Sequence, residues 1–300
     1  MTVNSVKNSK VWFGFSALLV GTSLLLMVLS TVKLGAPVRL GLDFTGGTKL
    51  EYSFVDPTRL ANLNSGSVIE ILNSIGLNNS TATITQDASP LLIIRTKAIS
   101  DDPAMDNLNL KLIETYGEYK INAIDTVSPI IGPELFQSGL LALCFTVIGI
   151  IIYISSRFKR DYAFAAILAL VHDVVILMGL FAFLGLFQGI EVNSLFITAI
   201  LTTFGFSVHD TIVVFDRIRE NQKLQTQKFK FSDVANLSVN QVSTRSLNTS
   251  ITTLTVLAFL FFFGGASTQL FVAALFVGLA IGTYSSLFLA SPLLVAFRAR

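Results

Sequence analysis

The segment that decides the fold spans residues 206–221 and reads FSVHDTIVVFDRIREN. It runs from an apolar helix that carries one carboxylic acid, Asp210, into a charged end that belongs in water. The preceding residues, 193–208, contain no Asp, Glu, Lys or Arg. An ionisable group inside a membrane-spanning helix is costly unless it faces protein or water. Asp210 is therefore a candidate functional residue, and the alternative is a structural hydrogen bond between helices.

The composition is typical of an integral membrane protein rather than a soluble enzyme, since 52% of the 300 residues are hydrophobic and 13% are charged. We predict a polytopic α-helical membrane protein with six transmembrane helices and one small α/β domain, which is periplasmic. The predicted spans are 11–32, 135–154, 162–184, 193–215, 246–263 and 270–296. Most have the roughly 20 apolar residues that a crossing requires, and 246–263 is marginal.

The first span is predicted to be retained, because its uncharged run from Val11 to Val32 is too long for a signal-peptide core. The single cysteine, Cys144, excludes an internal disulfide and a cysteine-cluster metal site. Two histidines are too few to indicate a metal site. We therefore expect no metal and no cofactor.

Positive charges predict the orientation. Lys and Arg occur at the N-terminus, in loop 157–160, in segment 217–245 and at Arg298 and Arg300, whereas loops 185–192 and 264–269 have none. Both termini are therefore predicted to be cytoplasmic. A net charge of +2 does not indicate a basic surface that binds nucleic acid.

The predicted domains are residues 1–34 (tail and first span), 35–134 (periplasmic α/β domain) and 135–300 (five-helix membrane domain with a cytoplasmic loop at 216–245). Turn and strand signals in the second domain predict the order β-α-β-β-α-β, as in a ferredoxin-like sandwich. The predicted strands are 48–55, 81–87, 91–97 and 119–127; the helices run from Pro57 to Ile75 and from Pro103 to Tyr116, and the hairpin turns at Ala88-Ser89-Pro90. Without a cluster of His, Cys or paired carboxylates, this domain is interpreted as a contact domain.

Ahead of the first strand, residues 41–48 read GLDFTGGT. Gly46 and Gly47 predict a sharp turn, because glycine tolerates positive φ and close backbone contact; Gly41 and Asp43 belong to the same motif. It is not a phosphate-binding loop, since no G-x-x-x-x-G-K-[ST] pattern occurs in the chain.

Helical spacing places Thr203, Ser207 and Asp210 on one face of the fourth span. In the fifth span Arg245, Thr249 and Thr252 share a face. A carboxyl group and a basic group on neighbouring helices can form a site that takes and releases protons. The alternative for Arg245 is a charge that snorkels to the membrane surface.

Two histidines precede aspartates, as His172-Asp173 and His209-Asp210. Adjacent residues point in different directions on a helix, so we do not expect either pair to form a dyad. His172-Asp173 lies near the middle of its span and is expected to face the polar interior of the bundle, with a direct role in proton transfer as the alternative. Titration of His209 could modulate Asp210.

The last span carries Gly278, Gly282 and Ser286 at spacings of four, a pattern that lets helices pack closely. We expect this face to stay exposed to lipid unless a second chain covers it. Segment 216–245 is expected to form a surface helix on the cytoplasmic face.

Several motifs together resemble the SecD/SecF family of the resistance-nodulation-division superfamily. They are GLDFTGGT after the first span, Ser-x-x-Asp at Ser207 and Asp210, and the pattern at Ser243, Arg245, Leu247, Asn248, Thr249 and Ser250. The last span is also similar. The resemblance covers nearly the whole chain, while His209 departs from the uncharged residue of some relatives.

The resemblance implies an auxiliary, non-enzymatic subunit of Sec protein export that uses the proton motive force. Its partners would be SecD, the SecYEG channel, the SecA motor and translocating preproteins. The location would be the inner (plasma) membrane, or the thylakoid membrane in a photosynthetic source. The implied proton relay comprises Asp210 and Arg245 with Asn248 and Thr249, and His172, Asp173, Ser207 and His209 are secondary candidates.

Two rival functions remain open at this point. One is a half-size proton-driven exporter of lipids or small molecules, although such exporters carry larger external domains. The other is a scaffold of the translocon in which Asp210 does not titrate.

Overall fold

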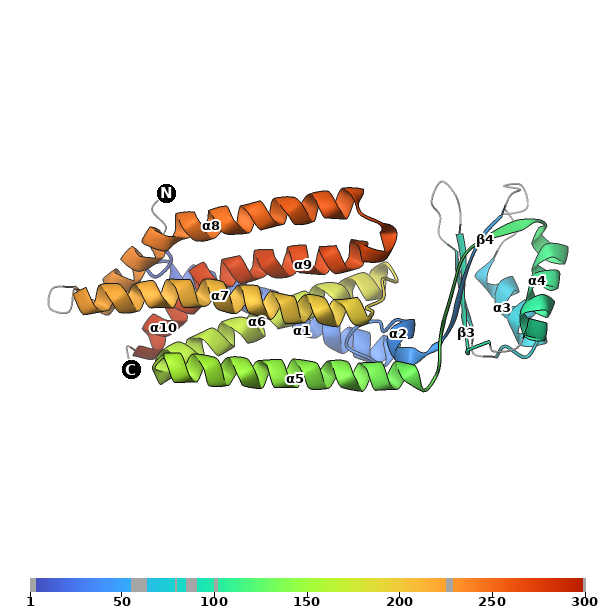
Figure 1. Cartoon of the computed structure of the whole chain (residues 1–300), viewed down its shortest axis with the longest axis horizontal. Helices are drawn as coiled ribbons and strands as arrows, with labels where there is room; N and C mark the ends of the chain where they lie inside the picture. Colours follow the sequence, from blue (N-terminus) through green and yellow to red (C-terminus); the bar gives the residue numbers. More distant parts are fainter. Residues whose placement is uncertain are drawn as a thin grey trace. The chain divides into compact units, whose positions relative to one another are not determined.

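The computed structural model describes residues 4–54, 64–78, 80–84, 91–99, 102–224 and 229–298. The chain forms two compact units (Figure 1). The helical unit comprises Met1–Arg39 and Gly139–Arg300, and the α/β unit comprises Leu40–Ser138.

Within the described residues, six helices are long and apolar enough to cross a membrane, as the sequence predicted. They are α1 (Ser9–Leu34), α5 (Ile131–Arg157), α6 (Arg160–Phe187), α7 (Ser194–Leu224), α8 (Phe231–Phe263) and the combined segment Ser267–Arg298. That last segment contains most of α9 (Ala266–Ser285), a π-helical turn (Ser286–Ala290) and α10 (Ser291–Arg298).

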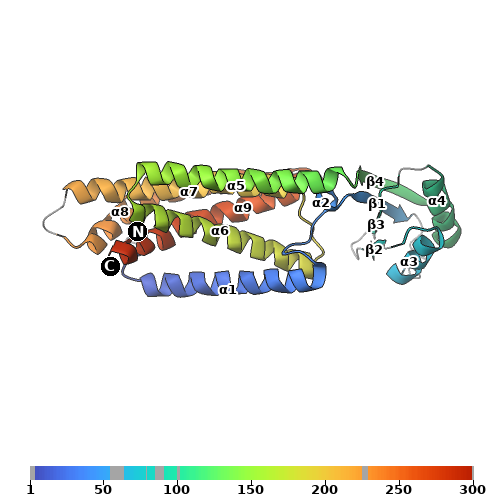
Figure 2. The same ribbon diagram turned by 90° about the horizontal axis from the view of Figure 1, so that it is seen from below.

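The helices α6, α7 and α9 form the centre of the helical unit. Helix α7 packs along α9, α8 covers both of them, and α1 packs along α6 (Figures 1 and 2). The buried residues of α1 are Ser16, Ser23 and Ser30, whose spacing of seven places them on one face. A Cβ on Gly179 of α6 would overlap Ser23, so small residues set this close approach. Helix α5 is peripheral, and its Phe145 side chain is 70% exposed.

In the described parts of segment 216–245, the expected separate surface helix is not found. Helix α7 continues to Leu224 and α8 already begins at Phe231, so the described part of this segment extends two long helices. Side chains join the two extensions, since Asn221 donates to Ser238 at 2.9 Å and to Gln241 at 2.7 Å. These contacts bury polar groups that a surface helix would leave in water, which explains why the helices continue.

The α/β unit contains β1 (Gly47–Phe54), α3 (Ser65–Ser74), β2 (Thr81–Ile84), β3 (Leu91–Thr96), α4 (Asp102–Tyr116) and β4 (Tyr119–Val127). The antiparallel sheet has the order β2-β3-β1-β4, which is the ferredoxin-like arrangement. Alternate residues such as Leu50, Tyr52, Leu92 and Ile94 bury one face of the sheet against α3 and α4. The predicted helix start at Pro57 and the turn at 88–90 lie outside the described residues.

The paired glycines of the GLDFTGGT motif, Gly46 and Gly47, lie where the chain enters the sheet, close to where it leaves again at Pro129. The short helix α2 (Leu42–Thr45) ends at Gly46, which has φ 68°, and Gly47 has φ 121°. A Cβ would lie 2.8 Å from the Cα of Pro129 at Gly46 and 2.6 Å from the carbonyl oxygen of Thr96 at Gly47. No other residue type fits both the backbone conformation and the space. The motif is therefore a tight joint at the base of the α/β unit.

Candidate proton-relay site in the helical unit

Asp173 of α6 is at the centre of a buried polar cluster, which we call the Asp173 cluster (His172, Asp173, Ser207 and Ser285). Its Oδ2 accepts hydrogen bonds from the hydroxyl groups of Ser207 on α7, at 2.5 Å, and Ser285 on α9, at 2.8 Å. Its Oδ1 lies 2.9 Å from Nδ1 of His172. The Asp173 side chain is 0% exposed. One carboxylate therefore joins three helices.

The contact between His172 and Asp173 corrects the expectation that adjacent residues cannot pair on a helix. An ionised carboxylate only accepts hydrogen bonds, so the geometry fits a His172 ring with its proton on Nδ1. The opposite nitrogen, Nε2, is buried without a hydrogen-bond partner. Both serine hydroxyls bind Oδ2, so the His172 ring supplies the partner that the buried Oδ1 needs.

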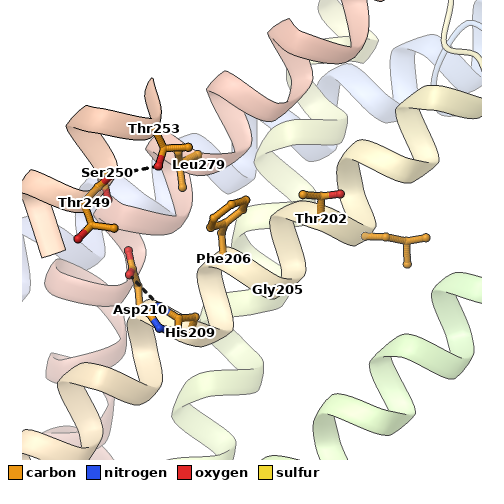
Figure 3. Close-up of a pocket in the computed structure, with 10 residues that line it drawn as sticks. Thr202, Gly205, Phe206, His209, Asp210, Thr249, Ser250, Thr253 and Leu279 are labelled. Atoms are coloured by element: carbon orange, nitrogen blue, oxygen red, sulfur yellow. Dashed lines mark hydrogen bonds and ion pairs between the residues drawn. The ribbon is translucent and has the colours of Figure 1, made fainter. Parts of the chain in front are cut away.

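Asp210 of α7 lies in a different environment, at the wall of a cavity of about 520 Å³ between α7 and α8 (Figure 3). We call this the Asp210 cavity. Its lining comprises Leu201, Thr202, Gly205, Phe206, His209, Asp210, Thr249, Ser250, Thr253 and Leu279. Asp210 Oδ1 lies 3.6 Å from His209 Nδ1, too far for a strong hydrogen bond. The His209 side chain is 69% exposed, so the cavity reaches the surface of this chain.

The predicted polar face of α7 divides between two neighbours. Ser207 points to Asp173, while Asp210, one turn later, points to α8. Thr211 contacts the π-helical turn that follows α9, with its hydroxyl oxygen 2.9 Å from that of Ser286. Helix α7 thus connects the enclosed Asp173 cluster to the open Asp210 cavity over a single turn.

The basic and polar candidates on α8 are exposed. Arg245, Asn248 and Thr249 lie on the outer side of this helix, and Thr249 lines the Asp210 cavity. Within the described parts of the chain, no ion pair joins Arg245 to Asp210. The hydroxyl of Thr249 donates to the carbonyl of Arg245 at 3.0 Å, and Thr252 donates to Thr249 at 2.8 Å. Their role in a relay stays a prediction.

The small-residue face of α9 packs within the chain, so the expectation that it would need a second chain is wrong. A Cβ on Gly278 would overlap the side chain of Thr203, and one on Gly282 would lie 3.0 Å from Cβ of Ser207. Ser286 donates to the carbonyl of Ser207 at 3.3 Å. Close approach of α9 to α7 is what brings Ser285 within reach of Asp173.

Ser285 is a site residue that the sequence reasoning did not single out. It lies in the run Thr283-Tyr284-Ser285-Ser286, where four successive polar side chains interrupt an apolar span. Thr283 donates to Ser250 of α8 at 2.7 Å, so this run ties α9 to α8 as well as to α6. The polar run itself was the available signal, because polar groups in a membrane helix require partners.

Comparisons with known proteins identify the family of the chain. Residues 108–300 match the family described as protein export membrane protein SecD/SecF, C-terminal, and residues 34–58 match the SecD/SecF GG motif. The protein translocase subunit SecF of Synechocystis sp. is 42% identical over 283 residues, which cover 93% of this chain and 89% of that protein. The chain belongs to the SecD/SecF family. Membership places it among protein-export components of the membrane rather than among enzymes.

Two further members support this assignment. The SecF subunit of Thermobaculum terrenum is 39% identical over 289 residues, covering 92% of this chain and 90% of that protein. The crystal structure of SecDF, a translocon-associated membrane protein from Thermus thermophilus, matches with a TM-score of 0.82 and 31% identity. The match covers 100% of this chain but only 39% of that SecDF chain. The present chain thus corresponds to a part of the SecDF protein.

Proposed function

We propose that this SecD/SecF family member is the SecF subunit of a Sec translocase, and that it couples proton entry to the export of preproteins. It works with SecD beside the SecYEG channel and the SecA motor. Membership of the family supports the role in export. The coupling to protons rests on the surroundings of Asp210.

The observation that carries the proposal is a carboxylate that no strong hydrogen bond satisfies. Asp210 is 8% exposed in an apolar helix, and its contacts are weak: His209 approaches it at 3.6 Å and Ser246 of α8 lies beside it. Asp173, by contrast, has three close contacts, with the hydroxyl groups of Ser207 and Ser285 and with the ring of His172. A carboxyl group at a cavity that reaches the surface can exchange protons, whereas a fully engaged one cannot do so without breaking its bonds.

The available energy matches an auxiliary role. Moving one elementary charge through the membrane potential is worth about 2.3 kcal/mol per 100 mV. This biases a conformational equilibrium by a factor of tens but does not move a whole polypeptide. Proton entry would therefore assist a motor that uses another source of energy.

We propose that Arg245 supplies the balancing charge when Asp210 ionises. Both residues lie on neighbouring helices, and Thr249, one turn after Arg245, already lines the Asp210 cavity. Asn248 and Thr249 would then bind water or the proton acceptor beside Asp210. A modest rotation of α8 or rotamer change would be needed, because Arg245 is exposed.

SecD is proposed to cover the Asp210 cavity. His209, Asn248 and Thr249 are exposed on α7 and α8 within membrane-spanning helices. Polar side chains at this depth normally face protein or water rather than lipid. A second six-helix chain with the same topology fits this surface, as in transporters built from two similar halves.

The proposed orientation has both termini in the cytoplasm and the α/β unit on the outside. The support is the distribution of Lys and Arg, which are absent from loops 185–192 and 264–269. The α/β unit would then meet the preprotein as it leaves the channel.

The test of the relay is precursor export in membrane vesicles whose only SecF is a variant. Asp210→Asn keeps size and hydrogen bonding but cannot titrate, so it should abolish the part of export that an uncoupler also abolishes. The matched control is Glu220→Gln, which removes an exposed carboxylate from the same helix. Full proton-dependent export by Asp210→Asn would leave the scaffold as the better account.

The test of the partner uses single cysteines after replacement of the native thiol by Cys144→Ser. Thr202→Cys and Thr249→Cys, both in the Asp210 cavity, should cross-link to SecD in native membranes. Phe145→Cys on the peripheral helix α5 is the control and should not. SecD adducts at Phe145 but at neither cavity position would place the interface elsewhere.

A further inference from the structure

A second cavity, of about 300 Å³, lies where α5 ends, α6 begins and the charged part of α7 passes. Four cations line it, namely Arg157, Lys159, Arg219 and Lys223, together with Phe158 and Tyr162. No carboxylate is among the described residues that line it. We call this the basic cavity. It belongs to neither the Asp173 cluster nor the Asp210 cavity.

The two arginines of the basic cavity are held in place before any ligand arrives. Asp216 binds both of them, Arg157 at 2.7 Å and Arg219 at 2.8 Å. Arg219 also donates to the backbone carbonyl of Arg157 at 3.1 Å. Both guanidinium groups lie over the ring of Phe158, at 5.8 and 5.2 Å from its centroid. Little side-chain entropy is therefore left to lose on binding.

Charge and depth indicate the ligand. Arg157, Lys159 and Arg219 alone outnumber Asp216, so the lining carries an excess of positive charge. The floor is apolar, since Phe158 is 7% and Tyr162 3% exposed. The apolar part of α7 ends at Asp216 and Arg217, which places the cavity at the membrane–water boundary. Phosphate groups of lipids occur at this level, with acyl chains directly beside them.

Snorkelling does not explain this arrangement. A snorkelling cation reaches water alone on its own stem. Here four cations from two segments converge on one cavity, and two of them are fixed by a shared carboxylate. Converging like charges repel each other, so an anion between them stabilises the arrangement.

We propose that the basic cavity binds the phosphodiester headgroup of an anionic phospholipid. The guanidinium groups of Arg157 and Arg219 offer donors in the fork geometry that matches phosphate oxygens. Lys159 and Lys223, both exposed, add positive charge at the mouth. The acyl chains would continue along the apolar outer face of the helices.

The experiment measures lipid binding to the purified full-length protein by native mass spectrometry. Phosphatidylglycerol is titrated against phosphatidylcholine, whose phosphodiester carries a compensating cation. The double variant Lys159→Gln/Lys223→Gln should lower phosphatidylglycerol affinity by on the order of tenfold and leave phosphatidylcholine unchanged. Both lysines are exposed, so folding should be unaffected.

The matched control is Arg160→Gln/Arg217→Gln. It removes the same charge from the same loop and the same helix, but Arg160 lines another cavity and Arg217 pairs with Glu220. Affinity in the control should stay within about twofold of the native protein. Equal losses in both double variants would show a diffuse electrostatic effect and overturn the site.

Inorganic phosphate separates a lipid site from a site for a free anion. Millimolar phosphate should not displace phosphatidylglycerol, because the free anion lacks the acyl contacts. Displacement at millimolar phosphate, or equal affinity for the two lipids, would overturn the lipid assignment.

Discussion

Asp173 and Asp210 are carboxylates in the same helical unit, but their surroundings differ. Asp173 is 1% exposed and is engaged by Ser207, Ser285 and His172 from three helices. Asp210 is 8% exposed, faces a cavity and has weaker contacts, to His209 at 3.6 Å and to Ser246 of α8. The difference in exposed fraction is small, so burial alone does not distinguish the two acids. The number and closeness of their hydrogen bonds do.

Each hydrogen bond between membrane helices contributes about 0.6 kcal/mol on average. Two of the three partners of Asp173, Ser207 and Ser285, lie on other helices, so these bonds contribute roughly 1 kcal/mol of packing free energy, and the weaker contacts of Asp210 contribute less. Substitutions at the two positions should therefore affect different properties.

The largest effect on stability is expected from Asp173→Leu. The change leaves His172 buried with no partner at either ring nitrogen and removes the acceptor of Ser207 and Ser285. We expect a loss on the order of 2 kcal/mol. The measurement is the midpoint temperature of unfolding in detergent, followed by size-exclusion chromatography.

The control for Asp173→Leu is Asp210→Leu, which places the same side chain at an open cavity wall. Its midpoint should stay close to that of the native protein while proton-dependent export is lost. Equal destabilisation by both substitutions would remove the distinction between the two acids.

A smaller effect on stability is expected from Gly278→Ala. The added Cβ would overlap Thr203 at the enclosed side of α7 and should cost about 1–3 kcal/mol, at the low end if Thr203 shifts. Gly205→Ala is the matched control on the cavity side, where a Cβ meets no atom within 4 Å. It should be neutral or stabilise α7 by up to about 1 kcal/mol. The same thermal measurement separates them, and an equal loss at Gly205 would contradict an open cavity.

The sequence predicted the fold better than the connections within the site. Apolar runs predicted the six spans because the bilayer imposes their length. The order of strands and helices predicted the sandwich of the α/β unit. The spacing of Ser207 and Asp210 placed them on one face, but the neighbour that each one faces depends on how α6, α8 and α9 pack.

Two errors have the same physical origin. The face of Gly278 and Gly282 was expected to pack against a second chain, and His172 was not expected to contact Asp173. Helical periodicity gives the direction of Cβ atoms but neither the partner helix nor the bend of a long side chain. Both are tertiary properties, which a single helix does not specify.

The role of Arg245 can be tested by replacing its guanidinium group with a side chain that has no charge or a charge of different shape. Arg245→Ala should lower proton-dependent export about tenfold or more, since Asp210 would lose its proposed charge partner, and Arg245→Lys should keep part of the activity because a point charge replaces the fork incompletely. The measurement is the initial rate of precursor export at a fixed proton gradient. Full activity of Arg245→Ala would identify this residue as a snorkelling charge.

The smallest effect is expected from His209→Asn, because His209 contacts Asp210 only at 3.6 Å and its ring is 69% exposed. The variant should keep proton-dependent export within about twofold of the native rate, since Asn supplies a similar polar contact. The measurement is the initial rate of precursor export at a fixed proton gradient.

The size of the loss distinguishes a neighbour of Asp210 from a member of the relay. If His209 itself carried the proton, His209→Asn would abolish proton-dependent export, as Asp210→Asn should. A rate close to the native one would instead assign proton transfer in this cavity to Asp210, with His209 as a polar neighbour at its exposed edge.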